Sequence, residues 1–253
     1  MTNGGSSNAR LYALHERILE AAQASGTPLK LVGGMAIELR SGPVPEGLGR
    51  TFGDLDYIAR RRDRRAVERL FEVAGFVRDP ASAQSAHRRQ VWEPPEGGEH
   101  VDVFLGAFEM CHTLHLEDRL GGPHPALPAA DLLLTKLQIV ELNDKDRTDL
   151  IRLLSTHLLG DSDADGVIEL AYLTGLLGSD WGLFTTVTDN LRVLVSDQDM
   201  AATPEGRDAA EVSQALLEAA EAAPKSSAFR MRARLGRRKQ WYRLPEELLE
   251  DGA

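Results

Sequence analysis

Asp54-Leu55-Asp56-Tyr57-Ile58-Ala59 and, further along the chain, His100-Val101-Asp102-Val103-Phe104 are short apolar runs that carry acidic residues at alternate positions. This pattern predicts two strands. Side chains alternate along a strand, so Asp54 and Asp56 are expected on one face, with their Cα atoms roughly 7 Å apart. Asp102 is expected to lie in the same way on the second strand, while its two valine neighbours point inward.

The elements expected around these strands alternate between helix and strand. They are a helix over 10–24, a strand over 29–32, a helix over 35–40, a helix over 63–74 capped by Asp63, and a hairpin of 88–92 with 101–105. Beyond the turn at 121–125 the apolar spacing becomes helical throughout, over 132–142, 146–158, 164–177, 181–195 and 209–222. We therefore predict an α/β (α+β) domain with a mixed sheet over residues 1–125. An all-α domain follows over 126–253 and ends in a basic tail.

The composition is that of a soluble globular protein. Of 253 residues, 42% are hydrophobic and 27% are charged, and no apolar run reaches the length of a membrane span. The single cysteine, Cys111, excludes an internal disulfide and favours a reducing, cytoplasmic location. The first ten residues, rich in Gly, Ser and Asn, are expected to be a frayed tail.

The charge is unevenly distributed along the chain. Residues 225–243 hold eight basic residues and no acidic one, so the remainder of a chain with net charge −10 carries about −18. Trp241 and Tyr242 lie within this basic stretch, and aromatic rings among positive charges suit RNA. A solvated helix end, or an arm that docks on the acidic body, is an equally open interpretation.

The paired carboxylates indicate a metal site. Two carboxylates on one face of a strand repel each other unless a cation lies between them, and oxygen ligands of this kind suit Mg²⁺. Phosphoryl and nucleotidyl transfer use such carboxylates to bind two metal ions. An Asp-x-Asp pair on a strand is more often a simple exposed pair, but Gly33-Gly34 at a strand-to-helix junction favours a phosphate nearby.

Three runs of the sequence together resemble a known family: Gly33-Gly34-Met35-Ala36, Arg50-Thr51-Phe52-Gly53-Asp54-Leu55-Asp56 and Val101-Asp102-Val103-Phe104. They are similar to the nucleotidyltransferases of the DNA polymerase β superfamily. The closer match is the abortive-infection branch of AbiEii-like and MenT-like toxins from bacterial toxin–antitoxin pairs. Lys136-Leu137 and Lys145-Asp146-Arg147-Thr148-Asp149-Leu150 match the helical half of that branch, and the resemblance covers about residues 29 to 155.

The resemblance implies a role for each matching residue. Asp54, Asp56 and Asp102 would bind Mg²⁺, with Asp102 nearest the attacking hydroxyl. Lys136 would join the catalytic set by neutralising the triphosphate that Gly33 and Gly34 bind. At the nucleotide, Asp146 or Asp149 would orient Lys136 or the base, with a helix-surface salt bridge as the alternative. Arg50 and Thr51 would brace the strand or contact a phosphate. Two departures are the Gly-Gly pair in place of the Gly-Ser of the wider superfamily, and the long Pro/Gly-rich link 41–49.

The expected function is therefore transfer of a nucleoside monophosphate from an NTP to a hydroxyl acceptor. By resemblance the acceptor would be the 3′ end of tRNA, for a toxin with an antitoxin partner. The alternative within enzymes is a small-molecule, aminoglycoside-type nucleotidyltransferase, which the acidic body suits. The alternative of another class is a non-catalytic nucleotide-binding or partner-binding module.

Overall fold

The computed structural model describes residues 4–80, 82 and 87–244, with side chains from residue 8 onward. The described chain forms two compact units. Unit 1 contains the described residues up to Leu39, Pro45–Phe108 and Leu114–Leu127. Unit 2 contains Arg40–Val44, Glu109–Thr113 and the described residues from Pro128 onward. The main division thus lies between Leu127 and Pro128, next to the predicted boundary at 125, and unit 2 also takes two short segments from the first half.

Unit 1 is built on a mixed five-stranded sheet with the order β1-β2-β5-β4-β3. Only the central pair, β2 and β5, is parallel; each other neighbouring pair is antiparallel. The predicted mixed sheet and the predicted hairpin of β4 with β5 are confirmed. The strands are β1 Leu29–Val32, β2 Leu55–Ala59, β3 Val77–Arg78, β4 Arg89–Glu93 and β5 Val101–Leu105.

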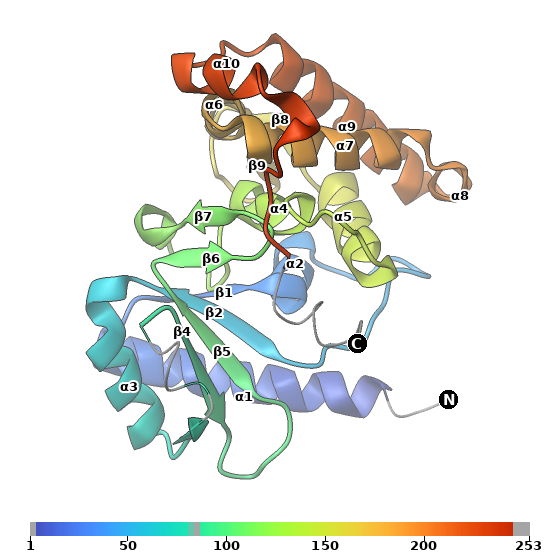
Figure 1. The fold of residues 1–253 in the computed structure, drawn as a ribbon. Helices are drawn as coiled ribbons and strands as arrows, with labels where there is room; N and C mark the ends of the chain where they lie inside the picture. The colour runs from blue at the N-terminus through green and yellow to red at the C-terminus, as the bar shows by residue number, and fades with distance from the viewer. Residues whose placement is uncertain (1–3, 81, 83–86, 245–253) are drawn as a thin grey trace, which may run out of the picture. The chain divides into compact units, whose positions relative to one another are not determined.

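The central strands are in the core because their residues are almost entirely apolar. Every residue of β1 and β5 is buried, and β2 is buried except for partly exposed Asp56. Figure 1 shows the helices α1 (Gly4–Ser25) and α3 (Arg64–Val73) close to each other, and their residues are in contact. The remaining helical segments of this half are α2 Gly33–Ser41, η1 Arg61–Asp63 and η3 Glu117–Arg119.

Two helix starts differ from the prediction. Helix α1 begins at Gly4, inside the segment expected to be frayed. The Asn8 amide in this segment accepts a hydrogen bond from Phe52 N at 3.1 Å and donates one to Arg50 O at 2.9 Å, so tertiary contacts stabilise the extra turn. The expected side-chain cap from Asp63 is also absent, because Asp63 ends the 3₁₀ turn η1 before α3 begins.

Unit 2 is mainly helical, as predicted, but it is not all-α. Strands β8 (Leu158–Gly160) and β9 (Val167–Glu169) pair in parallel, with Leu159 opposite Ile168. The helix predicted over 164–177 therefore begins only at Leu170, after the β9 pairing. The helices are α4 Ala129–Leu137, α5 Asp144–Thr156, α6 Leu170–Ser179, α7 Trp181–Ser196, α8 Gln198–Ala201, α9 Pro204–Ala222, α10 Ser227–Ala233 and η4 Gly236–Arg238. The strands β6 (Ala107–Glu109) and β7 (Thr113–His115) form a short hairpin.

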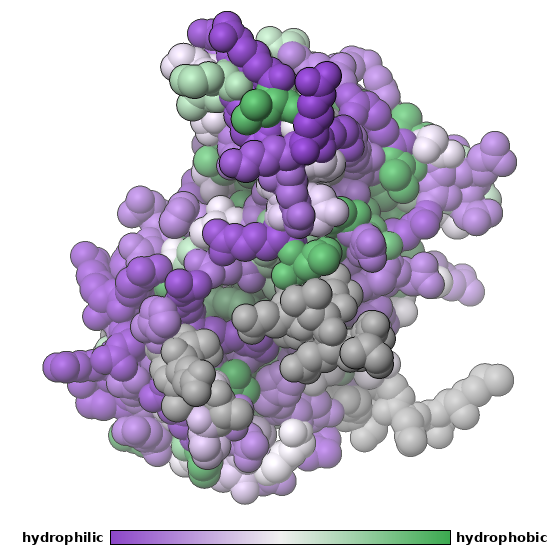
Figure 2. Space-filling view, viewed as in Figure 1, coloured by the Kyte–Doolittle hydropathy of each residue, from purple (hydrophilic) through white to green (hydrophobic). Residues whose placement is uncertain are grey.

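Figure 2 shows one face covered largely by hydrophilic side chains, with hydrophobic ones in scattered places. Scattered apolar residues are normal for a globular surface and do not by themselves mark a binding patch. Within the described residues, no helix has the length and apolar character that a membrane crossing requires.

Candidate functional site

The parallel pairing of β2 and β5 places two of the predicted carboxylates beside each other. Asp56 and Asp102 are register partners, each the second residue of its strand. Asp54 immediately precedes β2, whose first residue Leu55 donates its N–H to His100 O at 3.3 Å. We expected Asp54 to lie within the strand. It lies just outside, so the strand constrains the Asp54 side chain less than predicted. Asp54 is exposed, Asp56 is partly buried and Asp102 is 2% exposed.

Asp102 is held by a basic neighbour that the sequence did not single out. Arg89 Nη2 on β4 donates to Asp102 Oδ2 at 2.6 Å, and His100 Nε2 lies 3.6 Å from the same oxygen. Burial alone would raise the pKa of Asp102, but His100 and Arg89 lower it below the ordinary aspartate value. Asp102 itself raises the pKa of His100. The carboxylate is therefore kept ionised although it is buried.

The Gly-Gly pair begins α2, two residues earlier than the predicted helix, and each glycine touches a predicted site residue. Gly33 has φ +82°, and a Cβ added to it would lie 2.5 Å from Asp56 Oδ2. A Cβ on Gly34 would lie 1.7 Å from Arg50 Nη2. A side chain at Gly33 is disfavoured by its positive φ and by Asp56, whereas a side chain at Gly34 would require the Arg50 guanidinium to move. The structure thus brings Gly33, Gly34, Arg50 and Asp56 together.

Arg50 and Thr51 differ in their surroundings. The Arg50 guanidinium lies over the Phe52 ring, 5.0 Å from its centroid, and the Asn8 amide bonds to the backbone of the same segment. These contacts position the guanidinium beside the start of α2. Thr51 is exposed, and no contact of its side chain connects it to the other site residues among those described.

Lys136, Asp146 and Asp149 form a buried ion-pair cluster within unit 2. Lys136 Nζ on α4 lies 2.8 Å from Asp146 Oδ1 and 3.0 Å from Asp149 Oδ2, both on α5. Burial alone would lower the pKa of Lys136, but the charges of Asp149 and Asp146 raise it above the ordinary lysine value. Asn143 caps α5 by accepting from Asp146 N at 3.0 Å. The three residues thus contact each other within unit 2.

The donor chemistry of the carboxylate set fits a divalent cation, although the set is not gathered into one cluster. Among the described residues, no group of three or more His, Cys, Asp or Glu side chains is positioned to bind a metal ion. One oxygen of Asp102 is bonded to Arg89, but its buried Oδ1 has no hydrogen-bond partner. A buried carboxylate oxygen without a donor is a suitable ligand for Mg²⁺. The assignment of Asp54, Asp56 and Asp102 to Mg²⁺ therefore stays a prediction.

Part of the basic tail is engaged within unit 2. Arg237 pairs with Asp189 of α7 at 2.7 Å, and Trp241 Nε1 donates to Thr186 Oγ1 of the same helix at 3.1 Å. Arg232 donates to the carbonyl oxygens of Gly236 and Lys239. The arm therefore docks on α7 through Arg237 and Trp241, whereas these Arg232 bonds stay within the arm.

No protein-family model and no curated protein sequence matches the chain. Several solved structures resemble it, and two are described here. The solution structure of the antibiotic-resistance factor ANT(2'')-Ia aligns with a TM-score of 0.41 and 17% identity, over 59% of this chain and 84% of that chain. The lincomycin-bound crystal structure of the lincosamide antibiotic adenylyltransferase LnuA aligns with a TM-score of 0.41 and 16% identity, over 54% of this chain and 91% of that chain. Because these similarities are low, we base the proposed function on the site residues.

Proposed function

We propose that this chain is a Mg²⁺-dependent nucleotidyltransferase that transfers a nucleoside monophosphate from an NTP to a hydroxyl group and releases pyrophosphate. The observation that carries the proposal is the contact between Gly33 and Asp56, with Asp102 as the register partner of Asp56. A glycine at a helix N-terminus that directly abuts a strand carboxylate sets a phosphate site beside a cation site. These are the two components that nucleotidyl transfer requires.

Each residue has a defined part in the reaction. The N–H groups that begin α2 at Gly33 and Gly34 bind the phosphates, and Arg50 adds a positive charge beside them. Asp102, ionised and with one unpartnered oxygen, accepts the proton of the attacking hydroxyl at that oxygen. The acceptor oxygen then bonds to the α-phosphorus, and the bond from that phosphorus to the pyrophosphate oxygen breaks. Asp54, Asp56 and Asp102 would hold Mg²⁺, which would supply neutralisation of the charge that develops on the phosphate oxygens.

For the acceptor, we place a small cationic hydroxyl compound of the aminoglycoside type first. The chain outside 225–243 carries a net charge of about −18, which attracts a polycation and repels RNA. Arg237 and Trp241 of the basic tail, the main argument for RNA, already contact α7. The tRNA 3′ end, and with it a toxin role and an antitoxin partner, is the competing proposal from the family resemblance.

The test is transfer of radiolabel from each of the α-labelled NTPs, with Mg²⁺, to an aminoglycoside panel and to total tRNA. We expect Asp56→Asn to reduce transfer about a hundredfold or more, because loss of a metal ligand removes several kcal/mol of transition-state stabilisation. Asp208→Asn, an exposed substitution on α9, is the matched control and should leave transfer unchanged. Transfer that survives Asp56→Asn would refute the site. If Mg²⁺-dependent NTP binding occurs without transfer to either acceptor, the non-catalytic alternative is favoured.

A further inference from the structure

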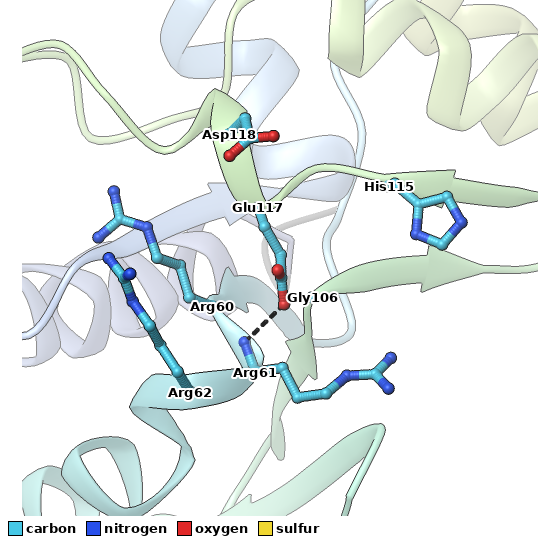
Figure 3. A pocket seen from close by; sticks show the side chains of 7 residues that line it. All are labelled: Arg60, Arg61, Arg62, Gly106, His115, Glu117 and Asp118. Carbon is cyan, nitrogen blue, oxygen red and sulfur yellow. Dashed lines mark hydrogen bonds between the residues drawn. The ribbon is translucent and has the colours of Figure 1, made fainter.

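A concave site lies within unit 1, apart from Asp54, Asp56 and Asp102. It is a hollow of about 720 Å³ lined by Arg60, Arg61, Arg62, Gly106, His115, Glu117 and Asp118 (Figure 3). Arg60 directly follows β2 and Gly106 directly follows β5, so the hollow lies at the carboxyl ends of the parallel pair. Asp56 and Asp102 lie near the opposite ends of the same strands. Ligands of open α/β sheets commonly bind outside the carboxyl ends of parallel strands.

The three segments that form the hollow are joined to each other by hydrogen bonds. Gly106 N donates to Ala59 O at 2.8 Å, and Leu116 N donates to Gly106 O at 3.2 Å. Glu117 Oε1 accepts from Arg61 N at 2.9 Å, the bond drawn in Figure 3. Gly106 has φ +86°, and a Cβ there would lie 2.4 Å from Glu117 Oε1. The site is therefore preformed by backbone geometry that only glycine allows at this position.

The guanidinium groups of the hollow are weakly neutralised. The Arg60 and Arg62 side chains approach Asp63 only at 3.9 and 4.0 Å, and the Arg62 side chain is 76% exposed. In the described part of the chain, the Arg61 guanidinium has no hydrogen bond or ion pair. In Figure 3, Arg60 and Arg62 extend to one side of Glu117 and Arg61 to the other. Since Glu117 bonds to a backbone N–H, the guanidinium forks remain available to a ligand.

We propose that this hollow binds a phosphate group. Arginine forks match the tetrahedral oxygens of phosphate through paired, charge-assisted hydrogen bonds. The volume lies within the range of small-molecule sites, whereas the charged lining disfavours the apolar ligands that such sites usually take. The phosphate can belong to a small phosphorylated compound or to the phosphodiester backbone of RNA. Both sources present the same chemistry to Arg60 and Arg62, which extend to the same side of Glu117.

The test is calorimetric titration of the full chain with inorganic pyrophosphate and, separately, with a short single-stranded RNA. EDTA is present throughout, so that binding through a metal ion at the carboxylates does not contribute. We expect saturable binding of at least one probe, weakened about tenfold or more when Arg60→Ala and Arg62→Ala are combined. The control combines Arg65→Ala with Arg69→Ala, two exposed α3 arginines outside the lining, and should change affinity less than about twofold in ~0.1 M salt.

A second variant is expected to change the affinity for phosphate in the opposite direction. In Glu117→Gln the amide oxygen still accepts the Arg61 N–H, but a negative charge leaves the hollow. Affinity for the phosphate probe should therefore rise, by about two- to fivefold for one charge several Å away. A loss of pyrophosphate binding in the arginine variant identifies a compact phosphate ligand, and a loss confined to RNA identifies the phosphodiester. Succinate, a dicarboxylate, is titrated for comparison. The proposal is overturned if neither phosphate probe saturates, or if succinate binds as tightly as pyrophosphate. It is also overturned if both double variants weaken binding equally, or if Glu117→Gln weakens binding.

Discussion

Replacement of Gly33 by alanine separates two effects that the structure combines at the start of α2. The added Cβ is placed on a backbone with φ +82° and lies 2.5 Å from Asp56 Oδ2. Left-handed backbone costs a residue with a Cβ about 1–2 kcal/mol, partly offset by about 0.4–1 kcal/mol from the smaller entropy of the unfolded chain. Displacement of a packed carboxylate adds roughly 1–3 kcal/mol. We therefore expect Gly33→Ala to lower the free energy of unfolding by roughly 2–4 kcal/mol.

Two other glycines serve as matched controls. Gly42 has φ +72° with nothing within 4 Å of an added Cβ, so Gly42→Ala measures the backbone effect alone, about 1 kcal/mol. An added Cβ on Gly53 also meets nothing within 4 Å, and its φ lies outside the left-handed range, so Gly53→Ala should be neutral or slightly stabilising.

The measurement is urea unfolding of the three variants, with radiolabel transfer measured in parallel. The midpoint should fall in the order Gly53→Ala, Gly42→Ala, Gly33→Ala, and the melting temperature of the last should drop by roughly 10 °C. Transfer should be lost in Gly33→Ala alone, because Asp56 and the start of α2 must move apart. If Gly33→Ala matches Gly42→Ala in stability and retains transfer, the contact between Gly33 and Asp56 does not build the site.

Three further predictions concern the buried charges and the metal. Lys136→Met should lower the free energy of unfolding by about 3–5 kcal/mol, because fully buried Asp149 loses its lysine partner. The control, Lys145→Met, replaces an exposed lysine and should change stability in urea little. Equal effects of the two substitutions would contradict the role of the cluster. Burial lowers the pKa of His15 in the folded chain. Its contribution to the free energy of unfolding is therefore fully present above the pKa of the unfolded chain, about 6.5, and is lost as the pH falls below that value. The pH profile of unfolding should therefore be flatter in His15→Gln between about pH 7 and 5, and parallel profiles would exclude this contribution. Chelation of divalent metal should abolish label transfer and leave the melting temperature unchanged, because the core of the sheet is apolar; a large fall in melting temperature would show a structural metal instead.

The sheet of unit 1 was predictable because its strands are buried apolar runs with clear ends. Residues 29–32 and 101–105 form strands with the predicted bounds, and both are buried at every position. The first turns of α1 were not predictable, because Gly, Ser and Asn have low helix propensity. Their helical state coincides with the hydrogen bonds of Asn8 to Arg50 and Phe52, residues more than 40 positions away. A local pattern carries no information about such contacts.

The same limit explains which site residues the sequence revealed. The carboxylates and glycines follow a recognisable spacing, so their positions could be named in advance. Arg89 has no such pattern: it reaches Asp102 because Val91, two residues further along β4, is the register partner of Asp102. That register depends on the connection between β4 and β5, which sequence alone did not specify. The strands β8 and β9 were missed for a related reason, since three-residue strands form only through their pairing partner.

The parallel pair β2 and β5 connects the two sites proposed in unit 1. From Asp56 to Arg60, and from Asp102 to Gly106, the chain advances four residues, or about 13 Å of extended strand. The carboxylates and the arginines therefore lie at separate positions along the strand pair. Both strands are buried and hydrogen-bonded over this length, so neither site needs the other to be occupied in order to form. Arg60→Ala with Arg62→Ala should consequently remove phosphate binding while small-molecule label transfer continues, and loss of both together would mean that the strand pair transmits a change between its ends.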